Sequence, residues 1–244
     1  GKHPDAASFR VTLFGSLAAT GKGHLTDVAI REALKPRDVE IVWKSAEELP
    51  RHPNGMRFEA LSESGNVLDT QEEYSLGGGE LLGDEQDDEN YPVDSLAAIL
   101  SHCQQTGTSF WQYVQQTEDE GIWKFLDELW TVMRRSVEAG LRSDGIIPGG
   151  LGLARKARFL YRKGKTLGAS FHPDAVLAAY AYAVAEENAC GGKVAAAPTC
   201  GSSGVLPAVL YWLRDELDCK PTDILRALAT AGLFGNVVKS SGSI

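Results

Sequence analysis

The first eighty residues carry the hydrophobic pattern of a small sheet with one helix. Hydrophobic and polar residues alternate along Phe9–Phe14, which predicts a β-strand. Thr26-Asp27 offers an N-cap and an acidic first turn for a helix over Val28–Leu34, which Lys35-Pro36 ends. Three further strands are predicted over Val39–Trp43, Arg57–Leu61 and Glu72–Leu76, with a turn at Ser64-Gly65-Asn66 between the last two. This order is typical of an open sheet with a helix on one face.

After Tyr91-Pro92 the hydrophobic spacing changes to that of helices. Seven helices are predicted, with Gly140 as the C-cap of the third and Thr222 as the cap of the last: Val93–Gln104, Ser109–Gln116, Gly121–Ala139, Leu153–Arg162, Pro173–Asn188, Leu206–Leu217 and Thr222–Val238. The acidic run Gly83–Asn90 is predicted to be a linker. We therefore expect an α+β protein with a small α/β sandwich domain over 1–82, an acidic linker over 83–91 and a mostly helical domain over 92–244, incomplete at its C-terminus.

The formal net charge of −9 argues against binding to nucleic acid and to anionic membrane surfaces. No apolar run reaches the roughly 18 residues of a membrane span, and no signal peptide opens the chain. Four cysteines lie far apart without a CxxC pair and are predicted to be reduced: Cys103, Cys190, Cys200 and Cys219. The composition thus predicts a cytosolic protein whose partners are small molecules or proteins.

The run Gly15–His24 joins the first predicted strand to the first predicted helix. Its glycines let the backbone approach a ligand, and free amide groups at a helix start favour an anion such as a carboxylate. Lys22 adds a positive charge, and His24 can hold or release a proton near pH 7. The spacing of Gly15 and Gly21 does not fit a P-loop, and no Ser or Thr follows Lys22. The run is either a functional loop or a structural turn with an incidental histidine.

A second candidate follows the helix that ends in Glu186-Glu187-Asn188. The loop continues through Cys190-Gly191-Gly192-Lys193 and then through Ala197–Gly204, where glycines alternate with hydroxyl side chains. Hydroxyl groups and free amides together could hold a polar ligand or an anion. The alternative is a loop between packed helices whose Ser and Thr residues only cap those helices.

Together the two loops resemble the iron–sulfur L-serine dehydratases, also called L-serine ammonia-lyases. The first loop matches that family's Gly-Ser-Leu-x-x-Thr-Gly-Lys-Gly-His signature. Other motifs match in the family's order: Thr26-Asp27, Asn54–Phe58, Tyr74–Gly79, Tyr91-Pro92, Glu186–Ala189, Gly192–Val194, Ala197–Thr199 and Gly201–Ala208. The resemblance covers nearly the whole chain. It implies a lyase that converts L-serine to pyruvate and ammonia without pyridoxal phosphate, and commonly a homodimer.

The same resemblance implies a 4Fe–4S cluster whose open iron acts as a Lewis acid on the substrate hydroxyl. The family's cluster cysteines are expected beyond Ile244, and its N-terminal Ser-Ser-Ser-His-Thr segment is absent. We therefore expect a chain truncated at both ends and inactive alone. No residue here, Cys200 included, is predicted to be a metal ligand, because one thiolate cannot hold a cluster normally held by several.

Residue chemistry and the resemblance together assign the site. His24 is the expected base or its proton partner, and Lys22 with the helix start is expected to hold the carboxylate. The other residues expected to bind substrate are Ser16, Thr20, Gly21 and Gly23 in the first loop, and Asn188, Thr199, Gly201, Ser202 and Ser203 in the second. We expect His24 to face the hydroxyl-lined second loop.

Two alternatives stay open. The first half also resembles the allosteric substrate-binding domain of some 3-phosphoglycerate dehydrogenases, which senses an anion or amino acid without catalysis. That alternative gives the helical half no role. The other alternative is a related iron–sulfur desulfidase that acts on cysteine.

Overall fold

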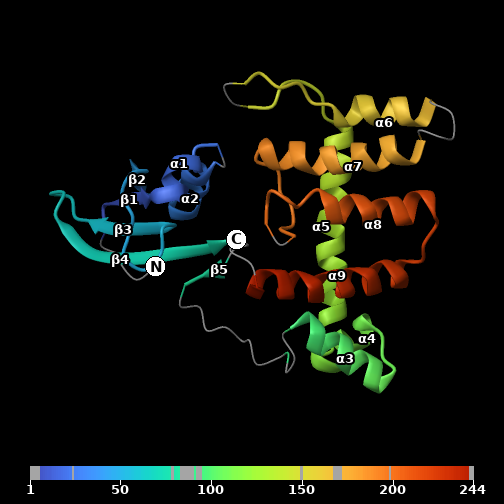
Figure 1. Ribbon diagram of the computed structural model, residues 1–244. Coiled ribbons are helices and arrows are strands. Elements are labelled where there is room, and N and C mark those ends of the chain that lie inside the picture. Colours follow the sequence, from blue (N-terminus) through green and yellow to red (C-terminus); the bar gives the residue numbers. More distant parts are fainter. Residues whose placement is uncertain are drawn as a thin grey trace. The chain divides into compact units, whose positions relative to one another are not determined.

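The computed structural model describes residues 6–23, 25–77, 80–82, 91, 95–148, 151–166, 172–197 and 199–241. The chain divides into two compact units, Gly1–Glu85 and Gln86–Ile244 (Figure 1). The first unit is a mixed sheet with helices, and every element described in the second unit is a helix apart from an isolated β-bridge. The expected α+β class is therefore confirmed.

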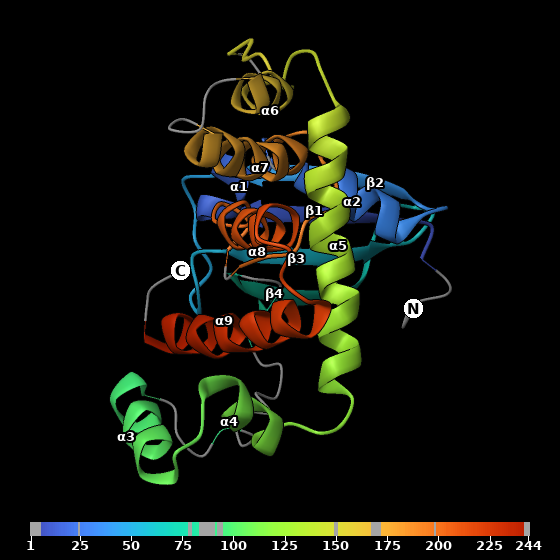
Figure 2. The ribbon, with the colours of Figure 1, turned by 90° about the vertical axis from the view of Figure 1, so that its right-hand side faces the viewer.

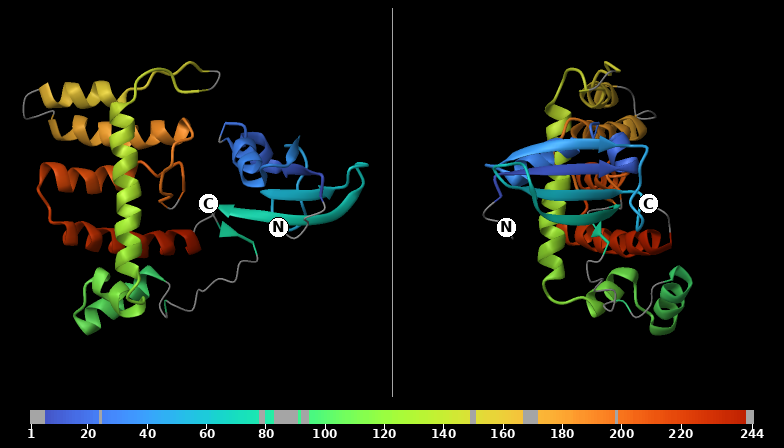
Figure 3. Two further views of the ribbon diagram at one scale, coloured as in Figure 1. Left: turned by 180° about the vertical axis from the view of Figure 1, so that it is seen from behind. Right: turned by 90° about the vertical axis from the view of Figure 1, so that its left-hand side faces the viewer.

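The first unit is built on a five-stranded sheet in the order β2-β1-β3-β4-β5 (Figure 3). Its strands are β1 (Ser8–Phe14), β2 (Asp38–Lys44), β3 (Gly55–Leu61), β4 (Val67–Gly77) and β5 (Glu80–Leu81). β1 and β2 are parallel, and the other neighbouring strands are antiparallel. A parallel pair needs a crossover connection, which the chain makes through two helices, α1 (Gly15–Thr20) and α2 (Thr26–Leu34).

The alternation seen in the first strand separates a hydrophobic face of the sheet from a polar one. Val11 and Leu13 of β1 are fully buried in a cluster with Ala18 of α1. On the opposite face, the Nε atom of Arg10 lies 2.8 Å from the Glu40 carboxylate on β2. The helices therefore cover one face, and cross-strand ion pairs stabilise the other.

Besides the short fifth strand β5, which is not among the four strands expected, two details of the helices in the first unit differ from expectation. The residues Gly15–Thr20 form the helix α1, where only a loop is expected. Thr26 is not the N-cap of α2, because that position is taken by Leu25, which has a positive φ of 58° and gives no side-chain cap. Both differences arise where the chain turns between two closely spaced helices, which local composition does not reveal.

The second unit holds the seven predicted helices, with ends shifted by a few residues. They are α3 (Leu96–Thr106), α4 (Phe110–Thr117), α5 (Ile122–Arg142), α6 (Ala157–Thr166), α7 (His172–Ala189), α8 (Val205–Glu216) and α9 (Pro221–Ser241). Figures 1 and 2 show α6, α7, α8 and α9 side by side, with α5 running across all four. The long amphipathic α5 thus buries one stripe against four partners.

Helix α7 lies at the centre of this unit. Val176, Ala179, Tyr180 and Ala183 have no exposed surface, because neighbours surround this helix on several sides. Three glycines pack on it so closely that an added Cβ would crowd or overlap α7: Gly140 in α5, Gly164 in α6 and Gly204 before α8. The apolar, alanine-rich sequence of α7 therefore reflects close helix packing.

Two predicted helix caps are wrong. Gly140 is an interior residue of α5, which continues to Arg142, and its missing side chain allows the close contact with α7. Thr222 lies inside α9, which begins at Pro221. Proline suits a first helical position because its fixed φ fits the helix and it has no N–H to satisfy. Gly140 marks a place where two helices cross. In the local sequence, a glycine at such a crossing looks the same as a glycine at a helix end.

Candidate functional site

The first candidate loop is shaped by α1 and by the turn that follows it. Ser16 and Thr20 are exposed on α1, where the Thr20 hydroxyl donates to the Ser16 carbonyl oxygen at 2.9 Å. Gly21 is buried, and a Cβ there would lie 2.8 Å from the Trp43 ring. Gly23 is exposed in the same turn, and its N–H donates to the Thr20 carbonyl oxygen.

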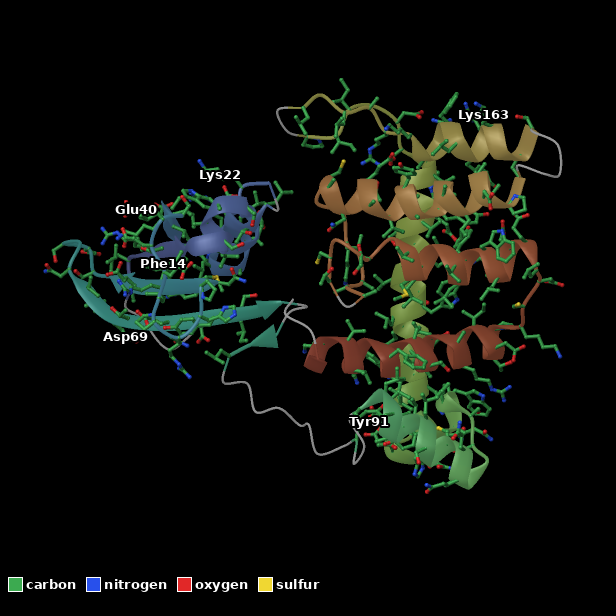
Figure 4. The ribbon with its side chains drawn as sticks, viewed as in Figure 1. Phe14, Lys22, Glu40, Asp69, Tyr91 and Lys163 are labelled. Atoms are coloured by element: carbon green, nitrogen blue, oxygen red, sulfur yellow. The ribbon has the colours of Figure 1, made fainter. Side chains whose placement is uncertain are left out.

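Lys22 is the charged group of this turn and is exposed (Figure 4). Its Nζ atom lies 5.4 Å from the centroid of the Trp43 ring, an arrangement that favours the cation. His24 lies outside the described residues, so its expected place opposite the second loop stays a prediction. The turn presents a positive charge to solvent on a glycine-rich backbone, as an anion site requires.

The second candidate loop begins where α7 ends in a Schellman motif. The Gly192 N–H donates to the Glu187 carbonyl oxygen at 2.8 Å, and the Gly191 N–H donates to that of Asn188 at 3.2 Å. Gly191 has a positive φ of 77°, which glycine adopts without strain. This turn fixes the direction in which the chain leaves α7 and so places Asn188 at the start of the loop.

Asn188 and the hydroxyl residues are tied together by short hydrogen bonds. The Asn188 Nδ2 atom donates to the Cys200 carbonyl oxygen at 3.2 Å. The Thr199 and Ser202 hydroxyl oxygens are 2.9 Å apart, and the Ser202 hydroxyl also donates to the Ala197 carbonyl oxygen at 2.7 Å. Thr199, Ser202 and Asn188 are all half-buried, and the Cys200 carbonyl oxygen that Asn188 binds directly follows Thr199 in the chain. The structure therefore brings three predicted residues together.

Ser203 and Gly201 differ from these three. Ser203 has no exposed surface, and its hydroxyl donates to the Cys200 carbonyl oxygen at 2.6 Å. Its observed contact is thus a structural one, and its expected substrate contact stays a prediction. Gly201 is exposed, and a Cβ there would meet only the Thr199 hydroxyl, at 3.7 Å. The loop therefore leaves room for a ligand beside Gly201.

The two glutamates before Asn188 have partners that the sequence analysis did not identify. Glu186 is 3% exposed, and its Oε1 atom accepts hydrogen bonds from the N–H groups of Lys156 and Ala157 at 2.5 and 3.1 Å. It therefore caps the start of α6 from a neighbouring helix. No described residue donates to its other oxygen, Oε2. Such a cap satisfies amide groups that the helix itself leaves unpaired.

Glu187 forms a largely buried ion pair with Arg155. The Arg155 Nη1 atom lies 2.6 Å from the Glu187 Oε1 atom, and the side chains are 10% and 15% exposed. Burial acts to lower the pKa of Arg155, but hydrogen bonding to Glu187 and the nearby Cys190 outweigh burial, so that pKa is raised. Arg155 is thus a residue of this site that sequence reasoning missed. Its only local signal is the basic character of the segment before α6.

We predict that Glu186→Ala will lower the free energy of unfolding by about 1–3 kcal/mol, because two amide groups at the start of α6 lose their acceptor. Glu186→Gln keeps an acceptor oxygen in nearly the same shape and should lose clearly less. Urea titration of both variants measures the difference. Equal losses would mean that the two hydrogen bonds contribute nothing specific.

The four cysteines are spread over the second unit. Cys103 is buried in the core, Cys190 and Cys219 are half-buried, and Cys200 is exposed. Within the described ranges, no group of three or more His, Cys, Asp or Glu side chains could hold a metal ion. These cysteines therefore do not fit the ligand set of an iron–sulfur cluster.

Comparison with known proteins shows which family this chain belongs to. The family model described as "Serine dehydratase alpha chain" matches residues 40–244. The chain belongs to this family. The match begins in β2 of the first unit and continues through all the described helices of the second.

Named relatives agree with this family assignment. L-serine dehydratase 2 of Escherichia coli (strain K12) is 32% identical over an alignment that covers 98% of this chain and 64% of the relative. The L-serine dehydratase of Streptomyces coelicolor is 32% identical with the same coverage, and that of Helicobacter pylori is 28% identical. The chain thus spans a little under two thirds of the length of these relatives. Among its described helices, none is both long and apolar enough to cross a membrane.

Proposed function

We propose that this chain belongs to an enzyme that converts L-serine to pyruvate and ammonia by eliminating water. The observation that carries the proposal is its 32% identity, over 98% of its length, to a protein named L-serine dehydratase. The two candidate loops support it with the groups such an elimination needs: a cation for the carboxylate, acceptors for the amino group, and a proton acceptor.

The second loop is suited to the amino group of the substrate. The Ser202 hydroxyl donates its single hydrogen to the Ala197 carbonyl oxygen, and the adjacent Thr199 hydroxyl can donate to Ser202. The Thr199 hydroxyl oxygen accepts from the Ser202 N–H at 3.2 Å and keeps one lone pair. The Ser202 hydroxyl oxygen accepts from the Thr199 hydroxyl and, at the long distance of 3.4 Å, from the Thr199 N–H, a weak bond that an ammonium group could replace. An ammonium group offers three donors and no acceptor, so this loop complements it. We propose that Thr199 and Ser202 accept from the serine ammonium, and that Asn188 holds their loop in place through Cys200.

The first loop is suited to the carboxylate and to proton transfer. Lys22 presents an exposed ammonium group, which can pair with the substrate carboxylate. We propose that His24 removes the proton from the α-carbon while the C–O bond breaks and the leaving hydroxide takes up a proton, so that one water is released. The resulting aminoacrylate then hydrolyses to pyruvate and ammonia without further help.

We further propose that the complete enzyme is a homodimer, uses no pyridoxal phosphate and carries a 4Fe–4S cluster. When bound, the cluster would supply a Lewis acid for the leaving hydroxyl. The described cysteines do not gather into a ligand set, so other residues would hold it. The chemistry that we assign to the described chain is binding of the substrate's charged groups and support of the loops that hold them.

Serine-dependent pyruvate formation tests this proposal. The full-length protein, prepared and assayed without oxygen, should produce pyruvate and ammonia in equal amounts from L-serine with no added pyridoxal phosphate. Absorbance in the visible range that is lost in air should accompany this activity. Absence of pyruvate from a protein that carries this absorbance would contradict the proposal.

Two other results would favour the alternatives. Tight binding of serine without turnover would favour an amino-acid sensor. Sulfide release from L-cysteine that greatly exceeds pyruvate formation from L-serine would favour a desulfidase.

A further inference from the structure

The segment before α6 reaches the second candidate loop through Arg155. Two backbone hydrogen bonds constrain this segment: the Ile147 N–H donates to the Leu153 carbonyl oxygen, and the Arg155 N–H donates to that of Gly145. The Arg155 N–H bond is 2.9 Å long, so the backbone of Arg155 is held in place just before α6. The guanidinium group then extends from a constrained position.

Arg155 holds Glu187 on the last turn of α7. The Arg155 Nη1 atom lies 2.6 Å from Glu187 Oε1, and both side chains are at least 85% buried. The other carboxylate oxygen of Glu187 lies against the turn, since a Cβ on Gly192 would come within 2.8 Å of Glu187 Oε2. The carboxylate is therefore confined between a cation and the glycine of the Schellman motif.

The next residue, Asn188, connects the end of α7 to the loop by a hydrogen bond. Its Nδ2 atom donates to the Cys200 carbonyl oxygen, which also accepts the hydroxyl of Ser203. Helix ends fray, and a side chain on a fraying turn cannot hold a partner in a fixed place. A firmly held last turn of α7 is thus a condition for a firmly held loop at Cys200.

We propose that Arg155 is a positioning residue: its ion pair with Glu187 fixes the end of α7 and so holds the Thr199–Ser203 loop in its binding-competent shape. The role in substrate binding rests on the proposed function, whereas the effect on the loop does not. Arg155 itself makes no contact with substrate in this proposal.

The chain offers a matched control in the ion pair of Lys165 with Glu216. This pair also joins a cation near α6 to a carboxylate on another helix, and Glu216 is as buried as Glu187, at 15% exposure. It lies at the opposite end of α8 from the loop, because the loop precedes Val205 and Glu216 ends that helix. Loss of this pair should affect stability without reaching the loop.

Hydrogen exchange of the full-length protein tests the inference without any assay of activity. Arg155→Gln should raise the exchange rates of backbone amides in residues 199–204 by about tenfold, as expected for loss of a charge-assisted hydrogen bond. Lys165→Gln should leave those rates unchanged. Glu187→Gln should act like Arg155→Gln, and Arg155→Lys should restore part of the protection because it keeps the charge without the planar fork.

Measurement of the KM for L-serine tests whether the shape of the loop affects substrate binding. In an enzyme that forms pyruvate, Arg155→Gln should raise the KM for L-serine by about tenfold and the control should not. Unchanged exchange at residues 199–204 in both Arg155→Gln and Glu187→Gln, or an equal change in Lys165→Gln, would overturn the inference. If Arg155→Gln does not fold, Glu187→Gln and Arg155→Lys carry the same test. If the wild-type protein forms no pyruvate, only the proposed function is contradicted. The hydrogen-exchange result does not depend on activity and would still test the role of Arg155.

Discussion

Gly140→Ala is expected to destabilise the helical unit by on the order of 3 kcal/mol. The added methyl group would come within 2.6 Å of the Ala183 α-carbon, at a crossing between α5 and α7 where both residues are buried. Backbone atoms cannot rotate away as the end of a flexible side chain can, so the two helices must separate. That separation would loosen contacts along the fully buried side of α7.

Thermal unfolding followed by circular dichroism measures this effect, which should appear as a melting temperature lower by about 10 °C. Gly232→Ala in α9 is the matched control. Gly232 is exposed, and a Cβ there would meet nothing within 4 Å, so only helix propensity changes. That variant should be about 0.5–1 kcal/mol more stable than wild type. Equal stability of the Gly140→Ala variant and wild type would mean that α5 and α7 do not cross closely here.

The seven helices of the second unit were predictable because each buries one or more stripes at the helical period. α5 shows this most clearly, since Leu126, Trp130, Met133 and Val137 recur every three or four residues and are all buried. The first strand was predictable for a similar reason, because the core on one side and the ion pairs on the other impose its alternation. The periodicity of hydrophobic residues thus indicates which face of each helix or strand is buried.

Periodicity does not report contacts between distant parts of the chain. Glu186 binds amide groups about 30 residues earlier, and Glu187 binds Arg155, 32 residues earlier. From the sequence alone the two acidic residues indicated only a polar helix end beside a possible site. Gly140 shows the same limit, since a glycine near a helix end and a glycine at a helix crossing have the same local sequence.

Some features of the candidate site follow from the local sequence, and others depend on contacts with distant parts of the chain. Asn188, Thr199 and Ser202, which the sequence analysis assigned to substrate binding, lie in one hydrogen-bonded loop, because short polar residues with glycines close their own loops; their role in binding substrate stays a prediction. What composition could not distinguish is which hydroxyl remains half-buried, as at Ser202, and which is fully buried, as at Ser203. That difference depends on the packing of the following glycine, Gly204, against α7.

His24→Ala in the full-length enzyme is expected to lower kcat for L-serine by about 10²–10⁴-fold, the usual contribution of a general base. The KM for serine should change little, because the proposed contacts to the carboxylate and the amino group involve Lys22, Thr199 and Ser202. Steady-state pyruvate formation, measured without oxygen, gives both constants.

The dependence of kcat on pH separates a base from a structural residue. A base must be unprotonated to act, so wild-type activity should rise with pH as the imidazole loses its proton. The His24→Ala variant should lack that rise, and added imidazole should restore part of the activity. His102→Ala is the control, because His102 packs its ring 5.0 Å from that of Tyr113 in the helical unit and has no assigned role in the reaction. Turnover of the His24→Ala variant at the wild-type rate, with an unaltered pH profile, would show that another group removes the α-proton.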